Sequence, residues 1–309
     1  MSETNAALTL NHCCLCPRRC GVDRAAGALG YCKSGVKSLV SSVCIHHGEE
    51  PAISGEKGIC NVFFAHCNLR CVYCQNHQIS RNDSVMAEYE CDTEKLARKI
   101  IAVIEKTKTD MLGFVSPAHF SLQMVEVIQK LHSQGYAPTV VYNTNGYETP
   151  DILDYLADYV DVYLPDFKYS DNALAARFSD VADYAEKTLD ALKIIYRQKG
   201  SWLQTDNHGL ARNGIIIRHL VLPGHVENSK GVLRAVAAID PNLHISLMSQ
   251  YYPPAQLHIP ELDRHLYPAE YESVINEMES LGLENGWIQE LESAENYRPD
   301  FEREEPFFS

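Results

Sequence analysis

Three cysteines in one short loop are the residues of this sequence whose types and spacing most clearly allow chemistry. Cys67, Cys71 and Cys74 stand in the stretch FFAHCNLRCVYCQN, directly after an apolar run. Spacings this short let neighbouring thiolates converge on one small iron–sulfur cube, whereas structural zinc sites usually combine two C-x2-C pairs. Three protein ligands leave one iron of a four-iron cluster open to an exogenous ligand. An open coordination position is typical of a catalytic metal centre.

A second group of cysteines precedes this loop, in the stretch CCLCPRRCGVDRAAGALGYC. Cys13, Cys16, Cys20 and Cys32 could supply four ligands, and a site with no open position would be structural. Zinc would stabilise a segment too short and polar to fold by apolar burial. An auxiliary 4Fe–4S cluster fits the spacing equally well, and four free thiols are the third alternative. The sequence therefore predicts a second metal site and leaves zinc and iron–sulfur open.

The composition is that of a globular protein with one large core, at 309 residues and 45% hydrophobic content. The net charge is −14 and no Lys/Arg-rich run is present, so nucleic acid is not an expected partner. No apolar run approaches the roughly 18 residues of a membrane helix, and no secretory signal is visible. Clustered cysteines without a disulfide-scaffold pattern favour metal binding in a reducing cytoplasm.

The elements that must position the cysteines can be expected from the apolar pattern. After the N-terminal segment, β-branched apolar runs alternate with stretches of helical period. Six strand–helix units in series indicate a parallel sheet with helices outside it. The expected strands are 59–67, 111–117, 138–146, 160–168, 214–224 and 244–253. The expected helices are 93–108, 120–135, 149–159, 171–199, 229–239 and 268–282.

The chain is therefore expected to be an α/β protein, a partial (β/α)6 TIM-like barrel with a small Cys-rich N-terminal module. A doubly wound open sheet is the competing architecture. The predicted domains are the module over 1–57, the barrel over 58–285 and a C-terminal extension over 286–309. The extension either covers the open edge of the barrel or is mobile. The run HHGEEPAISG is interpreted as a solvated connector, although its histidines and glutamates could instead reach the barrel mouth.

Polar side chains follow the expected strands, where a barrel carries its functional residues. Taken singly, each has an ordinary structural explanation, such as a surface ion pair, a barrel-filling residue or an Asn-Gly turn. Their recurrence at successive strand ends favours one common site. The residues are Ser116, Asn143, Asn145, Asp166, Lys168, Arg218 and Gln250.

The cysteine loop, with Tyr73 before its last cysteine, resembles the signature of the radical S-adenosylmethionine (SAM) superfamily. The resemblance implies that the open iron of a 4Fe–4S cluster binds SAM through its amino and carboxylate groups. One electron, from a flavodoxin or ferredoxin-type donor, then cleaves SAM to a 5′-deoxyadenosyl radical that abstracts a substrate hydrogen. The aromatic ring at Tyr73 would lie near the adenine.

Further segments are similar to pyruvate formate-lyase activating enzyme and its relatives, most of all to a paralogue group with a Cys-rich N-terminus. DFK matches a D-x-K element and RHLVLPG an R-x-x-V-x-P-G strand. Two departures are His66, where activases carry glycine, and VSPAHF, where they carry a Gly-Gly-Glu element. The resemblance implies a SAM site formed by Tyr73, Asn76, Ser116, Asn143, Asn145, Asp166, Lys168, Arg218 and Gln250.

The function expected from these observations is that of a radical SAM enzyme whose substrate is not identified. An activase-like protein target, a peptide and a small metabolite all fit the sequence. The alternative from another class is a non-catalytic iron–sulfur or zinc protein that transfers electrons or acts as a scaffold. RNA modification would need a basic surface, which a net charge of −14 does not favour.

Overall fold

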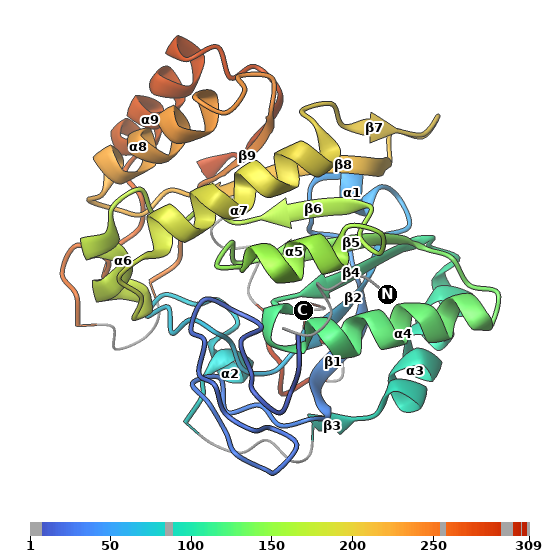
Figure 1. Cartoon of the computed structure of the whole chain (residues 1–309). Coiled ribbons are helices and arrows are strands. Elements are labelled where there is room, and N and C mark those ends of the chain that lie inside the picture. The colour runs from blue at the N-terminus through green and yellow to red at the C-terminus, as the bar shows by residue number, and fades with distance from the viewer. Residues whose placement is uncertain (1–7, 84–88, 254–257, 292–298, 304, 308–309) are drawn as a thin grey trace.

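Six parallel strands form the centre of one sheet in the computed structural model, which describes residues 8–83, 89–253, 258–291, 299–303 and 305–307 (Figure 1). They are β2 (Ile59–Phe64), β4 (Met111–Val115), β5 (Thr139–Thr144), β6 (Val162–Pro165), β8 (Ala211–Leu220) and β9 (His244–Met248). Each strand pairs in parallel with the next, in sequence order. A doubly wound sheet would reverse this order at its switch point. The predicted partial barrel is confirmed.

Four further strands extend the sheet in the described part of the chain. β1 (Ser38–His46) pairs antiparallel with β2, and β3 (Glu90–Cys91) pairs antiparallel with β1. β10 (Gly286–Ile288) pairs parallel with β9, and β7 (Gln204–Thr205) pairs antiparallel with β8. The strand order runs from β10 to β3, so the sheet does not close. None of these four strands was expected from the sequence. β1 lies within the range expected as the N-terminal module, and β10 within the C-terminal extension.

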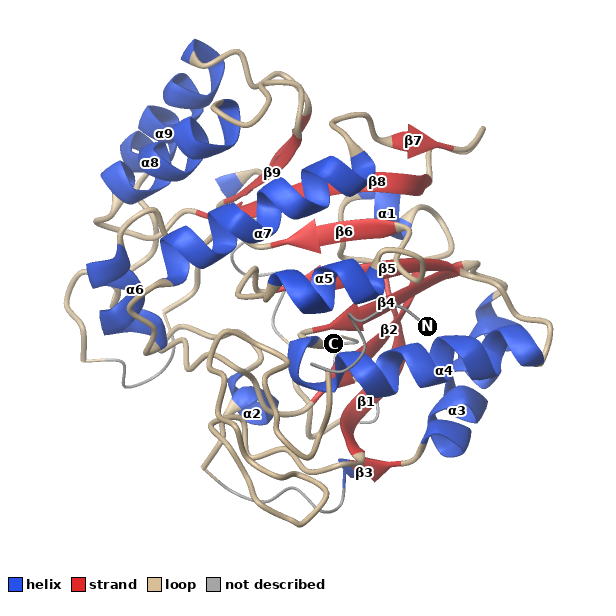
Figure 2. Cartoon of the chain, viewed as in Figure 1, coloured by secondary structure: helices blue, strands red, loops and turns tan. Residues whose placement is uncertain are grey.

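Helices cover the outer face of the central strands (Figures 1 and 2). The long ones are α3 (Thr93–Thr107), α4 (Ser121–Ser133), α5 (Pro150–Leu156), α6 (Asn172–Ser179), α7 (Tyr184–Lys199), α8 (Val226–Ala237) and α9 (Pro268–Ser280). The expected helix over 171–199 is divided because Asp180 takes a left-handed conformation at the end of α6. Short turns form α1 (Pro51–Ser54), α2 (His77–Ser80) and the 3₁₀ turn η3 (Ala118–Phe120). Within the described residues, no helix has the length and apolar character needed to span a membrane.

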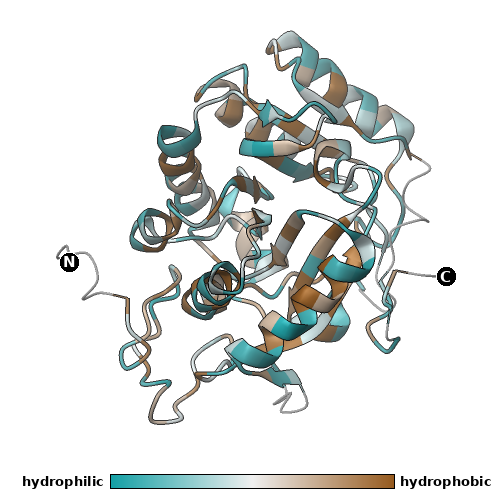
Figure 3. Cartoon of the chain, turned by 90° about the vertical axis from the view of Figure 1, so that its right-hand side faces the viewer, coloured by the Kyte–Doolittle hydropathy of each residue, from teal (hydrophilic) through white to brown (hydrophobic). Residues whose placement is uncertain are grey.

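The core has an outer and an inner layer, because successive side chains of a strand point to opposite faces. Outer-layer residues such as Leu112 and Tyr163 pack with the helices. The inner layer is smaller and includes Ile59, Val162 and Ile216. Ala52 and Ile53 of α1 belong to this inner cluster, so the segment after β1 enters the barrel. In Figure 3 the central strands are largely brown, while the helices alternate between brown and teal.

Glu148 is a buried carboxyl just after β5, with 1% of its surface exposed. Its Oε1 accepts hydrogen bonds from the hydroxyls of Tyr142 and Thr144, and its Oε2 has no partner among the described residues. Burial raises the pKa of Glu148 to about 7, although the two hydroxyls oppose this shift. Below that pH the folded chain holds the carboxyl in its protonated form.

Replacing Glu148 with Gln is expected to flatten the pH dependence of stability between about pH 5 and pH 8. In the unfolded chain the carboxyl ionises near a pKa of about 4.3. In this window the folded state therefore binds more protons, and the free energy of unfolding falls as the pH rises. The carboxyl accounts for up to about 3 kcal/mol of the loss. Urea unfolding followed by circular dichroism measures it, with Glu272→Gln on the exposed surface of α9 as control. Identical slopes in the two variants would contradict the assignment.

Candidate active site

The cysteine loop leaves β2 through His66, whose φ is 66°. The activase pattern has glycine here, and glycine adopts positive φ without steric cost. The backbone N–H groups of Arg70 and Val72 donate to carbonyls at the end of α6. The side chain of Asn82 both accepts from and donates to the backbone of Cys67. The protein itself therefore fixes the path of the loop.

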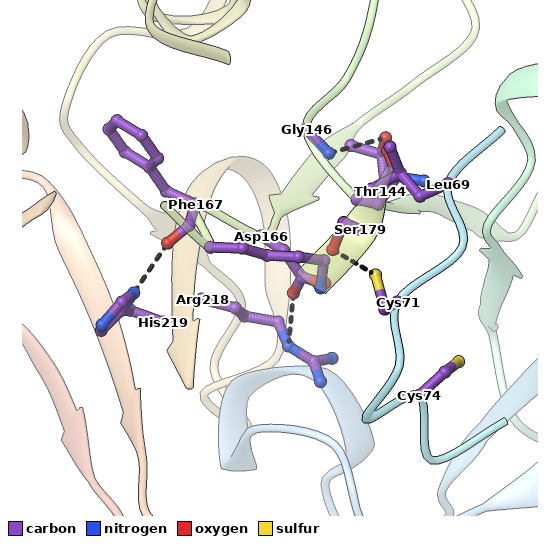
Figure 4. Close-up of polar contacts among 12 residues, drawn as sticks. Leu69, Cys71, Cys74, Thr144, Gly146, Asp166, Phe167, Ser179, Arg218 and His219 are labelled. Atoms are coloured by element: carbon purple, nitrogen blue, oxygen red, sulfur yellow. Dashed lines mark hydrogen bonds and ion pairs between the residues drawn. The ribbon is translucent and has the colours of Figure 1, made fainter. Parts of the chain in front are cut away.

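The three sulfurs of this loop all accept hydrogen bonds from the protein, as Figure 4 shows for Cys71. Burial raises the pKa of Cys67 to about 12 and that of Cys71 to about 11. Neither thiol ionises in neutral water unless a metal displaces its proton, and the hydrogen bonds would then stabilise the charge on sulfur. The donors are the Leu69 amide at 3.4 Å and Asn145 Nδ2 at 3.3 Å for Cys67, Ser179 Oγ at 3.0 Å for Cys71 and Ser80 Oγ at 3.2 Å for Cys74.

One cavity brings the cysteine loop and the predicted strand-end residues together. It contains about 1130 Å³ of empty space, part of it open to solvent. The predicted residues come from the loop and from the carboxyl ends of β4, β5, β6, β8 and β9. Those that line the cavity are Cys67, Cys71, Tyr73, Cys74, Asn76, Ser116, Asn143, Asn145, Asp166, Lys168, Arg218 and Gln250. Their binding of SAM stays a prediction.

Two cations share one carboxylate on the wall of this cavity. Lys168 Nζ lies 2.5 Å from Asp166 Oδ2. Arg218 Nε lies 3.5 Å from Asp166 Oδ1 (Figure 4). Burial is the largest influence on the pKa of Lys168 and lowers it, but the nearby acidic groups, Asp166 first among them, together outweigh burial and the pKa is raised. Both cations therefore remain charged, and such groups form strong hydrogen bonds with the anionic part of a ligand.

Glu49 and Glu50 also pair with Arg218, so the interpretation of residues 46–55 as a solvated connector is wrong. Glu49 Oε2 lies 2.8 Å from Arg218 Nη1, and Glu50 Oε1 lies 3.8 Å from Arg218 Nε. Glu49 Oε1 also accepts a hydrogen bond from the side chain of Asn61 in β2. The segment follows β1, and α1 packs in the inner core. This packing places the carboxylates of Glu49 and Glu50 beside the guanidinium of Arg218.

Other predicted residues take part in tyrosine and amide contacts. The Tyr73 hydroxyl lies 2.6 Å from the hydroxyl of Tyr169, and both side chains are buried. The Gln250 carbonyl accepts a hydrogen bond from the Gln75 side chain, which ties the end of β9 to the cysteine loop. Ser116, at the end of β4, has a φ of 54° in the segment where activases carry glycines.

The described part of the C-terminal extension forms another wall of the cavity. Pro299 and Phe307 line it. The Phe307 ring lies 4.1 Å from the ring of His46 and 5.3 Å from that of Phe63, centroid to centroid. Phe301 packs against Phe63 as well. The sequence-based expectation was that the tail covers the open edge of the barrel or is mobile, whereas these residues pack on β1 and β2 beside the cavity. The aromatic residues at the end of an acidic tail were the only signal for this role.

Other proteins share this architecture. Residues 61–208 match the model of the Radical SAM superfamily. The uncharacterized protein MJ0674 of Methanocaldococcus jannaschii is 29% identical over 283 residues, which cover 88% of this chain and 76% of that protein.

Two solved structures resemble the fold. SuiB of Streptococcus suis, bound to S-adenosylmethionine, has a TM-score of 0.51 and 10% identity over 75% of this chain and 50% of SuiB. HydG, a maturase of the [FeFe]-hydrogenase, has a TM-score of 0.52 and 12% identity over 77% of this chain and 53% of HydG. The chain thus spans about half the length of these two proteins, and at these identities the similarity concerns the fold alone.

Replacing Arg218 with Met is expected to lower the free energy of unfolding by about 3 kcal/mol, because buried carboxylates lose their cation. Adding Glu50→Gln to this variant should restore part of the loss, since one of those charges is then removed. Urea unfolding measures both effects. Arg98→Met on the exposed face of α3 is the control, with an expected change within about 0.5 kcal/mol. Equal losses in the Arg218 and Arg98 variants would contradict the buried ion-pair assignment.

Proposed function

We propose that this chain is an enzyme that reductively cleaves S-adenosylmethionine at a 4Fe–4S cluster and then abstracts a hydrogen atom from a substrate. The supporting observation is the cavity in which the thiols of Cys67, Cys71 and Cys74 face polar side chains from five successive parallel strands. Three thiolates leave one iron of such a cluster for a non-protein ligand. The match of residues 61–208 to the Radical SAM model supports the same chemistry.

Residues of the chain bind and orient the nucleotide. Lys168 donates to the carboxylate of SAM, because its ammonium keeps its charge beside Asp166. Arg218 adds a second positive charge on the same wall. When bound to the three thiols, the cluster supplies the electron that breaks the sulfur–C5′ bond of SAM, giving methionine and a 5′-deoxyadenosyl radical. Fixing SAM in one orientation brings the reacting atoms together without further entropic cost.

The cavity also offers apolar surface to the reacting groups. Val115, Leu220 and Met248 line it beside the polar residues, and Phe307 adds an aromatic ring from the C-terminal segment. A radical formed there contacts side chains in place of water, and the exclusion of water prevents side reactions.

The substrate we propose is a protein or a peptide, in line with the resemblance to activases. SuiB, which shares the fold, has been solved with its precursor peptide SuiA. A small metabolite is the alternative. A flavodoxin or ferredoxin-type donor supplies the electron, since an iron–sulfur cluster at low potential accepts one electron at a time. We place the protein in the cytoplasm, where thiols and clusters stay reduced.

Formation of 5′-deoxyadenosine tests the reaction. The anaerobically reconstituted protein, mixed with SAM and dithionite, is expected to release this nucleoside, as detected by mass spectrometry. Cys71→Ala should abolish it, whereas Cys14→Ser should retain it, because Cys14 does not line the cavity. If a protein with an intact, reducible cluster releases no nucleoside, the electron-carrier alternative takes its place.

Lys168→Met is expected to weaken SAM binding at least about tenfold, or about 1.4 kcal/mol, because a charge-assisted hydrogen bond is lost. Anaerobic equilibrium dialysis of the cluster-loaded protein with radiolabelled SAM measures the affinity. Lys187→Met removes an exposed lysine of α7 and serves as the matched control. Unchanged affinity in the Lys168 variant would remove this residue from the proposed SAM site.

A further inference from the structure

A second cavity lies within the N-terminal segment, and all four cysteines of the first sequence cluster line it. They are Cys13, Cys16, Cys20 and Cys32, while their neighbour Cys14 is not among the lining residues. Residues 8–37 form no helix or strand. Their path is set by local hydrogen bonds, such as that from the Arg19 amide to the Cys16 carbonyl.

The sulfur of Cys20 lies close to the backbone of Gly30 and Tyr31. It accepts a hydrogen bond of 3.4 Å from the Tyr31 amide, a contact that protein-bound iron–sulfur clusters use to tune their sulfurs. A Cβ atom added to Gly30 would lie only 2.9 Å from both the Cβ and the Sγ of Cys20. Gly30 therefore lets the chain carrying Cys32 approach the chain carrying Cys20, which brings cysteines from two parts of the segment to one cavity.

The same cavity contains a buried positive charge. Arg24 lines it with only 2% of its surface exposed. Its guanidinium donates to the carbonyls of Gly35 and His119 and lies 3.8 Å from Cys13 Sγ. Across the described part of the chain, no carboxylate forms an ion pair with it. A buried guanidinium without a counter-ion is costly, and a metal centre bound by four thiolates would supply the negative charge.

A buried imidazole nitrogen also lacks a partner here. His119 lines the cavity and is 2% exposed. Its Nε2 lies 2.9 Å from the Ala65 carbonyl and therefore carries the hydrogen. Its Nδ1 then holds a free lone pair and has no hydrogen-bond partner among the described residues. Cluster sulfurs accept hydrogen bonds and do not donate them, so this nitrogen marks the cavity as polar without choosing its occupant.

How closely the four cysteines converge bears on the choice between zinc and a 4Fe–4S cluster. Zinc holds its four sulfurs about 2.3 Å from one point, hence roughly 3.8 Å from each other. A 4Fe–4S cluster binds each thiolate on a different iron and tolerates a wider arrangement. Taking the described residues together, no three Cys, His, Asp or Glu side chains converge closely enough to hold a single metal ion. This is true of Cys67, Cys71 and Cys74 as well, the three thiols assigned to a cluster.

We propose that Cys13, Cys16, Cys20 and Cys32 bind a second 4Fe–4S cluster, with all four irons ligated by the protein. Asn68 lines this second cavity, and its Oδ1 lies 3.7 Å from Cys67 Sγ in the first. Arg18, another residue of the second cavity, donates to the Asn68 carbonyl. The two centres therefore adjoin each other across a single residue.

The test uses the full chain without its first centre, so that it is independent of the proposed function. The Cys67→Ala/Cys71→Ala/Cys74→Ala variant, reconstituted anaerobically, is expected to retain about four irons and four sulfides per chain. Dithionite should then produce the electron paramagnetic resonance signal of a reduced 4Fe–4S cluster. Zinc at about one ion per chain, or no bound metal, would overturn the proposal. Cys14→Ser added to this variant should leave the iron content unchanged.

Two glycine variants, made in the same triple-alanine variant, test the location of the second cluster without removing a cysteine ligand. Gly30→Ala should reduce the iron content or alter the signal, since the new methyl group collides with Cys20. Gly35→Ala places its methyl group in open space and should change neither. Circular dichroism melts verify that both variants fold. Equal iron content and signals in the two variants would show that the cluster lies elsewhere.

Discussion

The ion pairs of Arg218 join parts of the chain that are far apart in sequence. The side chain leaves β8 and meets Glu49, 169 positions earlier, together with Glu50 and Asp166. Since a guanidinium removed from water needs carboxylates at short range, the segment after β1 gains its place inside the barrel only when β6 and β8 are assembled around it. The inner core, the charged wall of the cavity and the position of β1 therefore depend on one another.

The central barrel could be predicted because strands buried on both faces appear in the sequence as continuous apolar runs. β2, β4 and β6 are buried at every residue, and they gave the clearest signals. The strands that were missed lack this property. β1 is only partly buried along its second half, and β3, β7 and β10 have two or three residues each. Their positions depend on pairing with a neighbouring strand, which local composition does not record.

The residues that line the cavity could be predicted, but the ion pairs and contacts among them could not. The carboxyl ends of neighbouring parallel strands meet at one edge, so polar residues at those ends are brought together by the fold alone. Whether a carboxylate faces solvent or a cation depends on residues that are far away in the sequence. Two consecutive glutamates normally indicate a solvated surface, and the partner that buries Glu49 and Glu50 is Arg218. The contact of Phe307 with His46 is equally non-local.

Left-handed residues beside the cysteines connect the backbone to the metal chemistry. Arg19, Lys33 and His66 each adjoin a cysteine of one of the two sets, with φ of 42°, 52° and 66°. For residues with a Cβ this conformation costs roughly 1–2 kcal/mol and persists only where surrounding contacts over-determine it. At His66 its amide donates to the Ile79 carbonyl, and Asn82 holds the backbone of the next residue, Cys67. Arg19 and Lys33 lie in a segment with no helix or strand. The amides of both residues donate to backbone carbonyls three positions earlier. A metal bound by the adjoining cysteines would add to this constraint, because metal-binding energy in such segments is also folding energy.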